Sequence, residues 1–174
     1  MDIALLALRL VVGVAFAAHG AQKLFGAFGG PGIRGTAGMF EQIGLRPGRL
    51  HAWASGLAEC AGGVLIAVGL LTPFAAAALI AVMTAAVLTV HVRNGFFNTS
   101  NGFEYNLVLV AAVFALAGVG AGDWSLDNAF GLDLNGAAWA LGALGVGILG
   151  GLGAILSARL AAHPRADHGE PSAA

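Results

Sequence analysis

The sequence predicts an α-helical bundle that crosses a lipid bilayer several times. Hydrophobic residues make up 58% of the 174 residues and charged residues only 10%. Soluble domains contain roughly 45–50% hydrophobic residues and about 25% charged residues. So few charges could not cover a soluble fold of this size. Five apolar stretches are also long enough, or nearly so, to cross the ~30 Å hydrocarbon core as helices. We therefore expect a four-helix transmembrane bundle followed by a fifth, C-terminal transmembrane helix.

Polar or proline-containing breaks separate the five stretches. They run from about Ile3 to Leu24, Ala52 to Leu71, Phe74 to Val92, Tyr105 to Val119 and Gly136 to Leu156. Helical hairpins are expected because a backbone N–H or C=O group cannot be left unpaired in lipid. The bundle then occupies residues 1–160. Residues 161–174 are polar, small and proline-containing, and we expect a disordered tail there.

The connection over about residues 26–50 is long for a helical hairpin. After several glycines, it mixes apolar residues with Arg34, Glu41, Arg46 and Arg49. This mixture is typical of a short amphipathic helix that lies in the membrane interface. We therefore expect an interfacial segment on the cytoplasmic side.

The basic residues fall almost entirely on one side of the membrane. Of the eight Lys and Arg residues, all except Arg9 lie at or near the ends that carry the 26–50 connection, the third connection and the tail. The opposite side carries Asp2, Asp123, Asp127 and Asp133. The positive-inside rule places the basic side in the cytoplasm, as in a multi-pass protein of the bacterial plasma membrane. We expect Asp127 to be accessible from outside the cell.

Ionisable residues inside the apolar stretches are the functional candidates, because charge in a membrane is costly. With ~1.5 Å of rise per helical residue, several polar residues from four stretches converge near the cytoplasmic level. These are His19, Lys23, Glu59, His91 and Glu104. Arg9 lies deeper, on the same face of its helix as Lys23. The convergence favours a shared site.

Structural interpretations of these residues are also open. Buried Glu59 has to be protonated or bonded to a cation, and Arg9, His19 and Lys23 are the candidates. An Arg9–Glu59 pair is equally compatible with a structural and a functional role. Lys23 alone is better explained by a side chain that reaches toward the headgroups. The single cysteine, Cys60, excludes a disulfide within the chain, and no close ligand motif supports a metal site.

Three sequence blocks occur together in a distinctive order and spacing. They are Arg9 followed by HGAQKLFG at 19–26, ECAGG at 59–63 followed by GLLTP at 69–73, and HVRNGFFN at 91–98 followed by GFEYN at 102–106. This combination resembles the DoxX family of small bacterial membrane proteins over about residues 3–119. The resemblance implies a four-helix membrane bundle, from which the fifth stretch is a departure. It also implies a redox setting, because relatives include the membrane subunit of thiosulfate:quinone oxidoreductases.

The residues and the resemblance together define a candidate site. We predict that His19, Glu59, His91 and Glu104 are the catalytic, proton-exchanging groups, and histidine suits this role near neutral pH. The predicted residues that bind substrate or quinone are Arg9, Lys23, Phe96, Phe97, Asn98 and Asn106. A bound quinone is the candidate cofactor.

Three functional hypotheses follow. The first is a membrane subunit of, or an accessory to, a quinone- or thiol-linked redox system. The second is a non-catalytic anchor that recruits a soluble redox protein through its basic cytoplasmic connections. The third is a small-solute or lipid transporter. The net charge of −1 gives no general attraction to nucleic acid. Small residues at 143, 147 and 151 predict close helix packing, either within the bundle or in a homo-oligomer.

Overall fold

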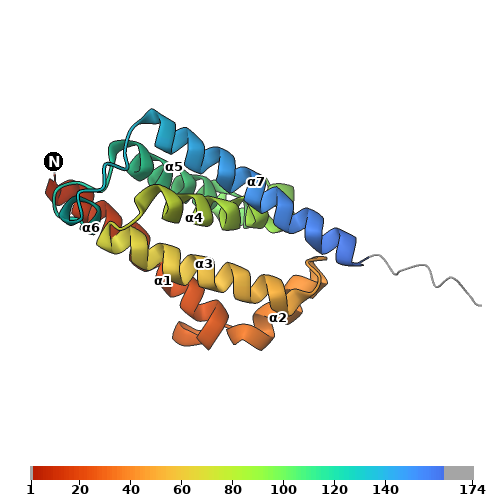
Figure 1. Ribbon diagram of the computed structural model, residues 1–174. Coiled ribbons are helices and arrows are strands. Elements are labelled where there is room, and N and C mark those ends of the chain that lie inside the picture. Colours follow the sequence, from red (N-terminus) through yellow and green to blue (C-terminus); the bar gives the residue numbers. More distant parts are fainter. Residues whose placement is uncertain (1, 163–174) are drawn as a thin grey trace, which may run out of the picture.

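A computed structural model describes residues 2–162 and shows two layers of helices (Figure 1). One layer contains α1 (Asp2–Phe25) and α3 (Gly48–Val68), and the other contains α4 (Thr72–Ala86), α5 (Glu104–Val119) and α7 (Ala137–Ala162). No strand occurs in this described part of the chain. The apolar helices α1, α3 and α7 are long enough to cross a membrane, as is the helical segment Thr72–Asn94. The predicted all-α membrane bundle is therefore confirmed, while residues 163–174 of the predicted tail lie outside the described residues.

The helix α5 is the shortest of the five apolar helical segments, because α4 continues in helical form to Asn94. Its 16 residues span ~24 Å, which is less than the ~30 Å hydrocarbon core. The π-helical turn η2 (Val87–His91) and the 3-10 turn η3 (Val92–Asn94) continue α4 to Asn94. A loop that contains η4 (Asn98–Ser100) then leads to α5.

Glycines bring α1 and α3 into close contact. A methyl group on Gly13 would lie 2.5 Å from the carbonyl oxygen of Gly63, and one on Gly20 would lie 2.5 Å from the backbone nitrogen of Cys60. Small residues allow two helix backbones to approach in this way. The contact fixes α1 against α3 and so positions the polar residues that the two helices carry.

The predicted small-residue face of α7 is confirmed as a packing face, and its partner is α4. Ala143, Gly147 and Gly151 are all buried. A methyl group on Gly147 would lie 2.6 Å from Cβ of Ile80, and one on Gly151 would lie 2.7 Å from the carbonyl oxygen of Ala81. Interior side chains shared by both layers fill the centre of the bundle, including Phe16, Ile66, Leu79, Val113 and Leu116.

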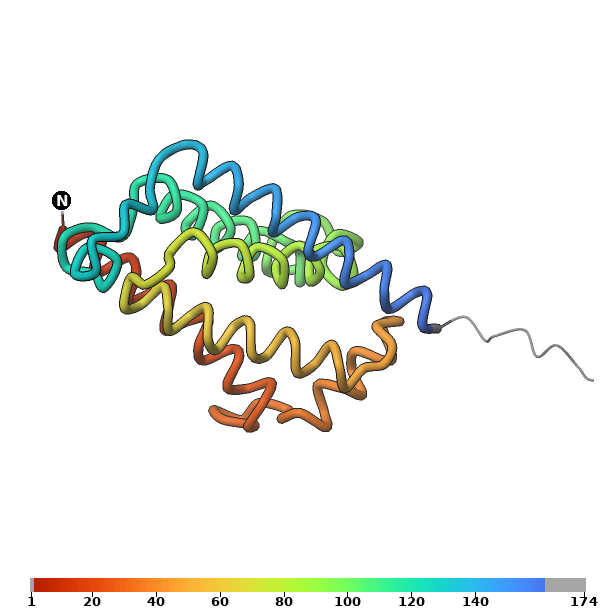
Figure 2. The backbone as a smooth tube through the Cα atoms, viewed as in Figure 1, coloured from red at the N-terminus to blue at the C-terminus, as the bar shows by residue number. Residues whose placement is uncertain are grey.

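The two ends of the bundle carry opposite charge. The acidic end, with Asp2, Asp123, Asp127 and Asp133, holds the start of α1, the α3–α4 turn and the short helix α6 (Leu126–Ala129). The basic end, with Arg34, Arg46, Arg49, Arg93 and Arg159, holds the opposite helix ends. There, η1 (Ala27–Gly29) and α2 (Gly32–Gln42) form the connection from α1 to α3, and α2 contacts both helices. Figure 2 shows α2 and the end of α7 far from the N-terminus.

Candidate functional site

A buried ion pair joins α1 to α3 in the half of the bundle nearer the basic end. Lys23 Nζ donates to Glu59 Oε1 at 2.7 Å and to Ser55 Oγ at 3.0 Å. The side chain of Glu59 is 2% exposed, and that of Lys23 is 24% exposed. Of the three cations that the sequence offers to Glu59, Lys23 is therefore the bonded one. The interpretation of Lys23 as a residue that only reaches toward headgroups is wrong, because its ammonium group turns back to α3.

The second carboxylate oxygen of Glu59 is buried and has no hydrogen-bond partner among the described residues. Leaving a buried acceptor unsatisfied costs about 1–3 kcal/mol, and buried polar atoms are normally hydrogen-bonded. His19 is a further electrostatic neighbour of the Glu59 carboxylate. It is exposed, and its ring centroid lies 6.2 Å from that of Tyr105 on α5. The free oxygen is thus available to a proton or to a donor group.

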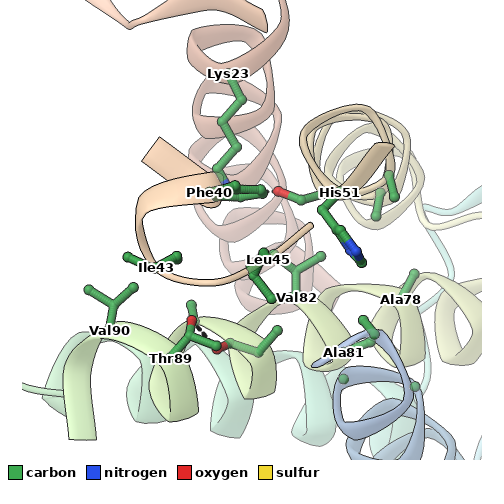
Figure 3. A pocket seen from close by; sticks show the side chains of 18 residues that line it. Lys23, Phe40, Ile43, Leu45, His51, Ala78, Ala81, Val82, Thr89 and Val90 are labelled. Atoms are coloured by element: carbon green, nitrogen blue, oxygen red, sulfur yellow. Dashed lines mark hydrogen bonds between the residues drawn. The ribbon is translucent and has the colours of Figure 1, made fainter. Parts of the chain in front are cut away.

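A cavity of about 300 Å³ lies beside this ion pair (Figure 3). Its walls come from α3, α4 and α7, and Phe40, Ile43 and Leu45 close it at the basic end. Half of the 18 lining residues are alanine or glycine, so the small size of these residues leaves the space between the helices. In Figure 3 the α2 segment faces α4 across the cavity.

The polar groups of the cavity are few and gather mainly on one wall. Lys23 and Ser55 line it and are joined by a hydrogen bond, and His51, which also lines the cavity, lies one turn before Ser55 on α3. On the opposite wall, the hydroxyl of Thr89 donates to the carbonyl oxygen of Ala85 at 2.7 Å. A cavity that is apolar apart from a few placed polar groups is typical of a small-molecule site. This one suits an apolar molecule with a hydrogen-bond acceptor at one end. No group of three or more His, Cys, Asp or Glu residues within 2–162 is arranged to hold a metal ion.

Arg9 is not hydrogen-bonded to Glu59, so the Arg9–Glu59 pair, one of the three pairings that the sequence leaves open, does not form. Arg9 is 1% exposed, and its Nη2 donates to the carbonyl oxygen of Trp124 at the acidic end. Lys23 lies fourteen residues further along α1, or about 21 Å away along the helix axis. The sequence interpretation failed because the segment after α5 folds over the start of α1 and supplies a partner for Arg9. The structure therefore does not bring Arg9 together with Lys23.

Asp127 is a structural residue that the sequence interpretation missed. Its Oδ1 accepts from the backbone N–H of Leu71 at 2.7 Å, and its Oδ2 accepts from the backbone N–H and the hydroxyl of Thr72 at 3.1 and 2.7 Å. The carboxylate thereby caps the first turn of α4, and it is 5% exposed. The expectation that Asp127 is accessible from outside is therefore wrong. Its local sequence resembles an ordinary polar loop and gives no sign of this contact.

The other predicted catalytic residues bond within the loop between α4 and α5. Nδ1 of His91 lies 2.9 Å from the carbonyl oxygen of Asn101. Glu104 Oε2 accepts from the backbone N–H of Asn98 at 2.9 Å. These contacts hold the loop in shape, and they use polar groups that the sequence assigns to the site around Glu59.

The predicted ring- and substrate-binding residues of the same region are also engaged locally. Phe96 packs edge to face on Phe97 and on Phe103, with ring centroids 5.3 and 5.5 Å apart. Asn106 is buried on α5 and donates to the sulfur of Met83 at 3.3 Å. The ten predicted site residues therefore fall into three groups: Lys23 and Glu59 with His19 nearby, the α4–α5 loop and start of α5, and Arg9 at the acidic end.

Three polar residues that were not predicted belong to the cavity, namely Ser55, His51 and Thr89. Ser55 precedes Glu59 by four residues, which is about one helical turn, so its proximity could have been recognised from the sequence. His51 lies one further turn back, in the first turn of α3. The alanines of the cavity walls could not be recognised from the sequence as lining residues. The cavity becomes evident only when the three helices are packed together.

Comparison with known proteins agrees with this architecture. The family model DoxX matches residues 4–92, which is just over half of the chain. The chain belongs to the DoxX family. The matched residues include the first two sequence blocks and Lys23 and Glu59.

Two bacterial proteins are similar to this DoxX-family chain over most of their own length. "Uncharacterized membrane protein Rv3486" of Mycobacterium tuberculosis (strain ATCC 25618 / H37Rv) is 31% identical over 131 residues, which are 70% of this chain and 77% of that protein. "Putative oxidoreductase CatD" of Bacillus subtilis (strain 168) is 32% identical over 117 residues, which are 67% of this chain and 81% of that protein. No solved structure matches the chain significantly.

Proposed function

We propose that this DoxX-family protein is a membrane component of a redox system that transfers electrons from a thiol donor to a quinone in the bacterial plasma membrane. The redox assignment is supported by the DoxX resemblance and by the oxidoreductase name of the Bacillus relative. The observation that carries the proposal is the ion pair of Lys23 and Glu59 at the wall of an apolar cavity. The cavity volume of about 300 Å³ is at the lower end of the range for small-molecule sites.

In this proposal the quinone ring occupies the cavity and Lys23 is the residue that touches it. The ammonium group has three N–H bonds. Two of them are used by Glu59 and Ser55, and the third is available to a quinone carbonyl oxygen. Ser55 accepts from Lys23 and keeps its own hydroxyl proton to donate. Glu59 acts as a positioning residue that holds the ammonium group at the cavity wall.

The reaction oxidises two thiols to one disulfide and reduces one quinone to its quinol. Two S–H bonds break, one S–S bond forms, and two electrons and two protons reach the quinone oxygens. Cys60 is the single cysteine of the chain, so the disulfide forms on a donor or on a soluble partner. The free oxygen of Glu59 and the nearby imidazole of His19 provide proton-exchanging groups close to the cavity.

Membrane vesicles from the host test this function. Thiol-dependent quinol formation is compared in vesicles from cells with and without the gene, and after complementation. Wild-type protein should restore the rate, whereas the Lys23→Met/Glu59→Gln double variant, present at equal abundance, should not. A rate that does not change when the gene is deleted would overturn the proposal.

The basic end supports a second candidate function, that of an anchor for a soluble redox protein. Arg46 and Arg93 are both exposed there, and exposed cations steer acidic partners. In that case Arg46→Glu/Arg93→Glu would abolish co-purification of a soluble partner, whereas the Lys23→Met/Glu59→Gln variant would retain both the partner and the quinone-linked rate.

A further inference from the structure

A second cavity, of about 380 Å³, lies at the basic end between α2 and the first turn of α3. It is lined by Arg34 on α2 and Arg49 on α3, together with Glu41. Glu41 Oε1 accepts from the backbone N–H of Gly48 at 3.3 Å, so part of this carboxylate is used at the start of α3. The two guanidinium groups and the positive end of the α3 helix dipole leave the cavity positive.

The face of α3 below this cavity continues as an apolar stripe. Arg49, Trp53 and Leu57 recur every four residues and therefore lie on one side of the helix. All three are exposed, with Trp53 at 39% and Leu57 at 52%. The helix α3 is apolar and long enough to cross a membrane, so an exposed apolar stripe on it faces lipid. A tryptophan just below a cationic residue is the usual order of side chains at a membrane interface.

We propose that this corner of α2 and α3 binds an anionic phospholipid, with the phosphate between Arg34 and Arg49 and an acyl chain along Trp53 and Leu57. Guanidinium groups match phosphate oxygens through paired hydrogen bonds. The adjoining stripe is what distinguishes a lipid from a free phosphate ion, because an ion gains nothing from apolar surface. The site is independent of the redox function and of the cavity beside Lys23.

Native mass spectrometry of the full-length protein in mild detergent tests the site. Titration with phosphatidylglycerol and with phosphatidylcholine should show one phosphatidylglycerol bound preferentially. Arg34→Gln and Arg49→Gln should each weaken its binding about tenfold, which corresponds to the loss of one charge-assisted hydrogen bond. Arg93→Gln is the matched control, since it removes the same charge from an exposed residue of the basic end that does not line this cavity.

Several outcomes would overturn the assignment. Equal binding of the two lipids by the wild-type protein would do so without any variant. An equal loss in Arg93→Gln would show a diffuse basic surface instead of a site. Displacement of the lipid by millimolar inorganic phosphate, with no effect of Trp53→Ala, would show an anion site that does not recognise lipid.

Discussion

The ion pair of Lys23 and Glu59 predicts a marked asymmetry between single and double variants. Removing one member of a buried pair leaves an uncompensated charge, which typically costs about 3–5 kcal/mol. Lys23→Met leaves Glu59 alone at 2% exposure, so we expect a loss near the lower limit, about 3 kcal/mol, because Lys23 itself is partly solvated. Glu59→Gln leaves a lysine that retains 24% exposure and is able to turn toward water, so we expect about 1 kcal/mol.

The double variant should recover most of the loss. With both charges removed and the side-chain volumes roughly kept, its free energy of unfolding should lie within about 1 kcal/mol of wild type. The coupling between the two positions is then about 3 kcal/mol in magnitude. The assay is reversible unfolding in mixed micelles by SDS titration, followed by circular dichroism. Additive losses, with coupling below about 0.5 kcal/mol, would refute the inference that the two charges stabilise each other.

Three further predictions concern the bundle and its orientation. Asp127→Ala should lower the free energy of unfolding by about 2–4 kcal/mol, because it leaves the capped N–H groups of α4 unsatisfied. Asp133→Ala, in an exposed loop, should have little effect. Equal free energies of unfolding for the two variants would contradict the capping role of Asp127. Gly147→Leu should lower the melting temperature, because even the added Cβ would lie 2.6 Å from Cβ of Ile80. Gly153→Leu should not, because a Cβ at Gly153 meets open space. Equal melting temperatures for the two variants would mean that α7 is not packed as described. In a background without the native cysteine, Asp133→Cys should react with an impermeant maleimide on intact cells and Ser100→Cys should not, and the reverse pattern would invert the topology.

The sequence predicts the helices well because their signal is local. Apolar length sets each span, and Gly69 and Pro73 mark the turn between α3 and α4: Gly69 adopts a φ of +66° after α3, and Pro73 lies in the first turn of α4. The predicted start of α3 was late, because Gly48–His51 contains polar residues that still belong to its first turn. The small-residue face of α7 was also predictable, since four-residue spacing identifies a helix face.

The candidate site was predictable only in part, because its partners depend on long-range packing. Glu59 was correctly identified as an acid that needs a cation, yet three cations lay within plausible reach. The choice of Lys23 over Arg9 depends on Trp124, which is 115 residues from Arg9 in the chain. His91 and Glu104 share an approximate depth with Glu59, but depth does not specify direction, and both side chains bond to loop backbone.

The close contact of α1 and α3 means that uncharged positions determine the geometry of the charged ones. Gly20 lies one turn before Lys23 on α1, and it meets the backbone of Gly56 and Cys60, which flank Glu59 on α3. Any side chain at Gly20 would push the two helices apart at the level of the ion pair, and the bond from Nζ to Oε1 would lengthen although neither ionic residue had changed. Interhelical spacing in this protein is therefore a determinant of electrostatics, and a methyl group is a sufficient perturbation to separate two charges.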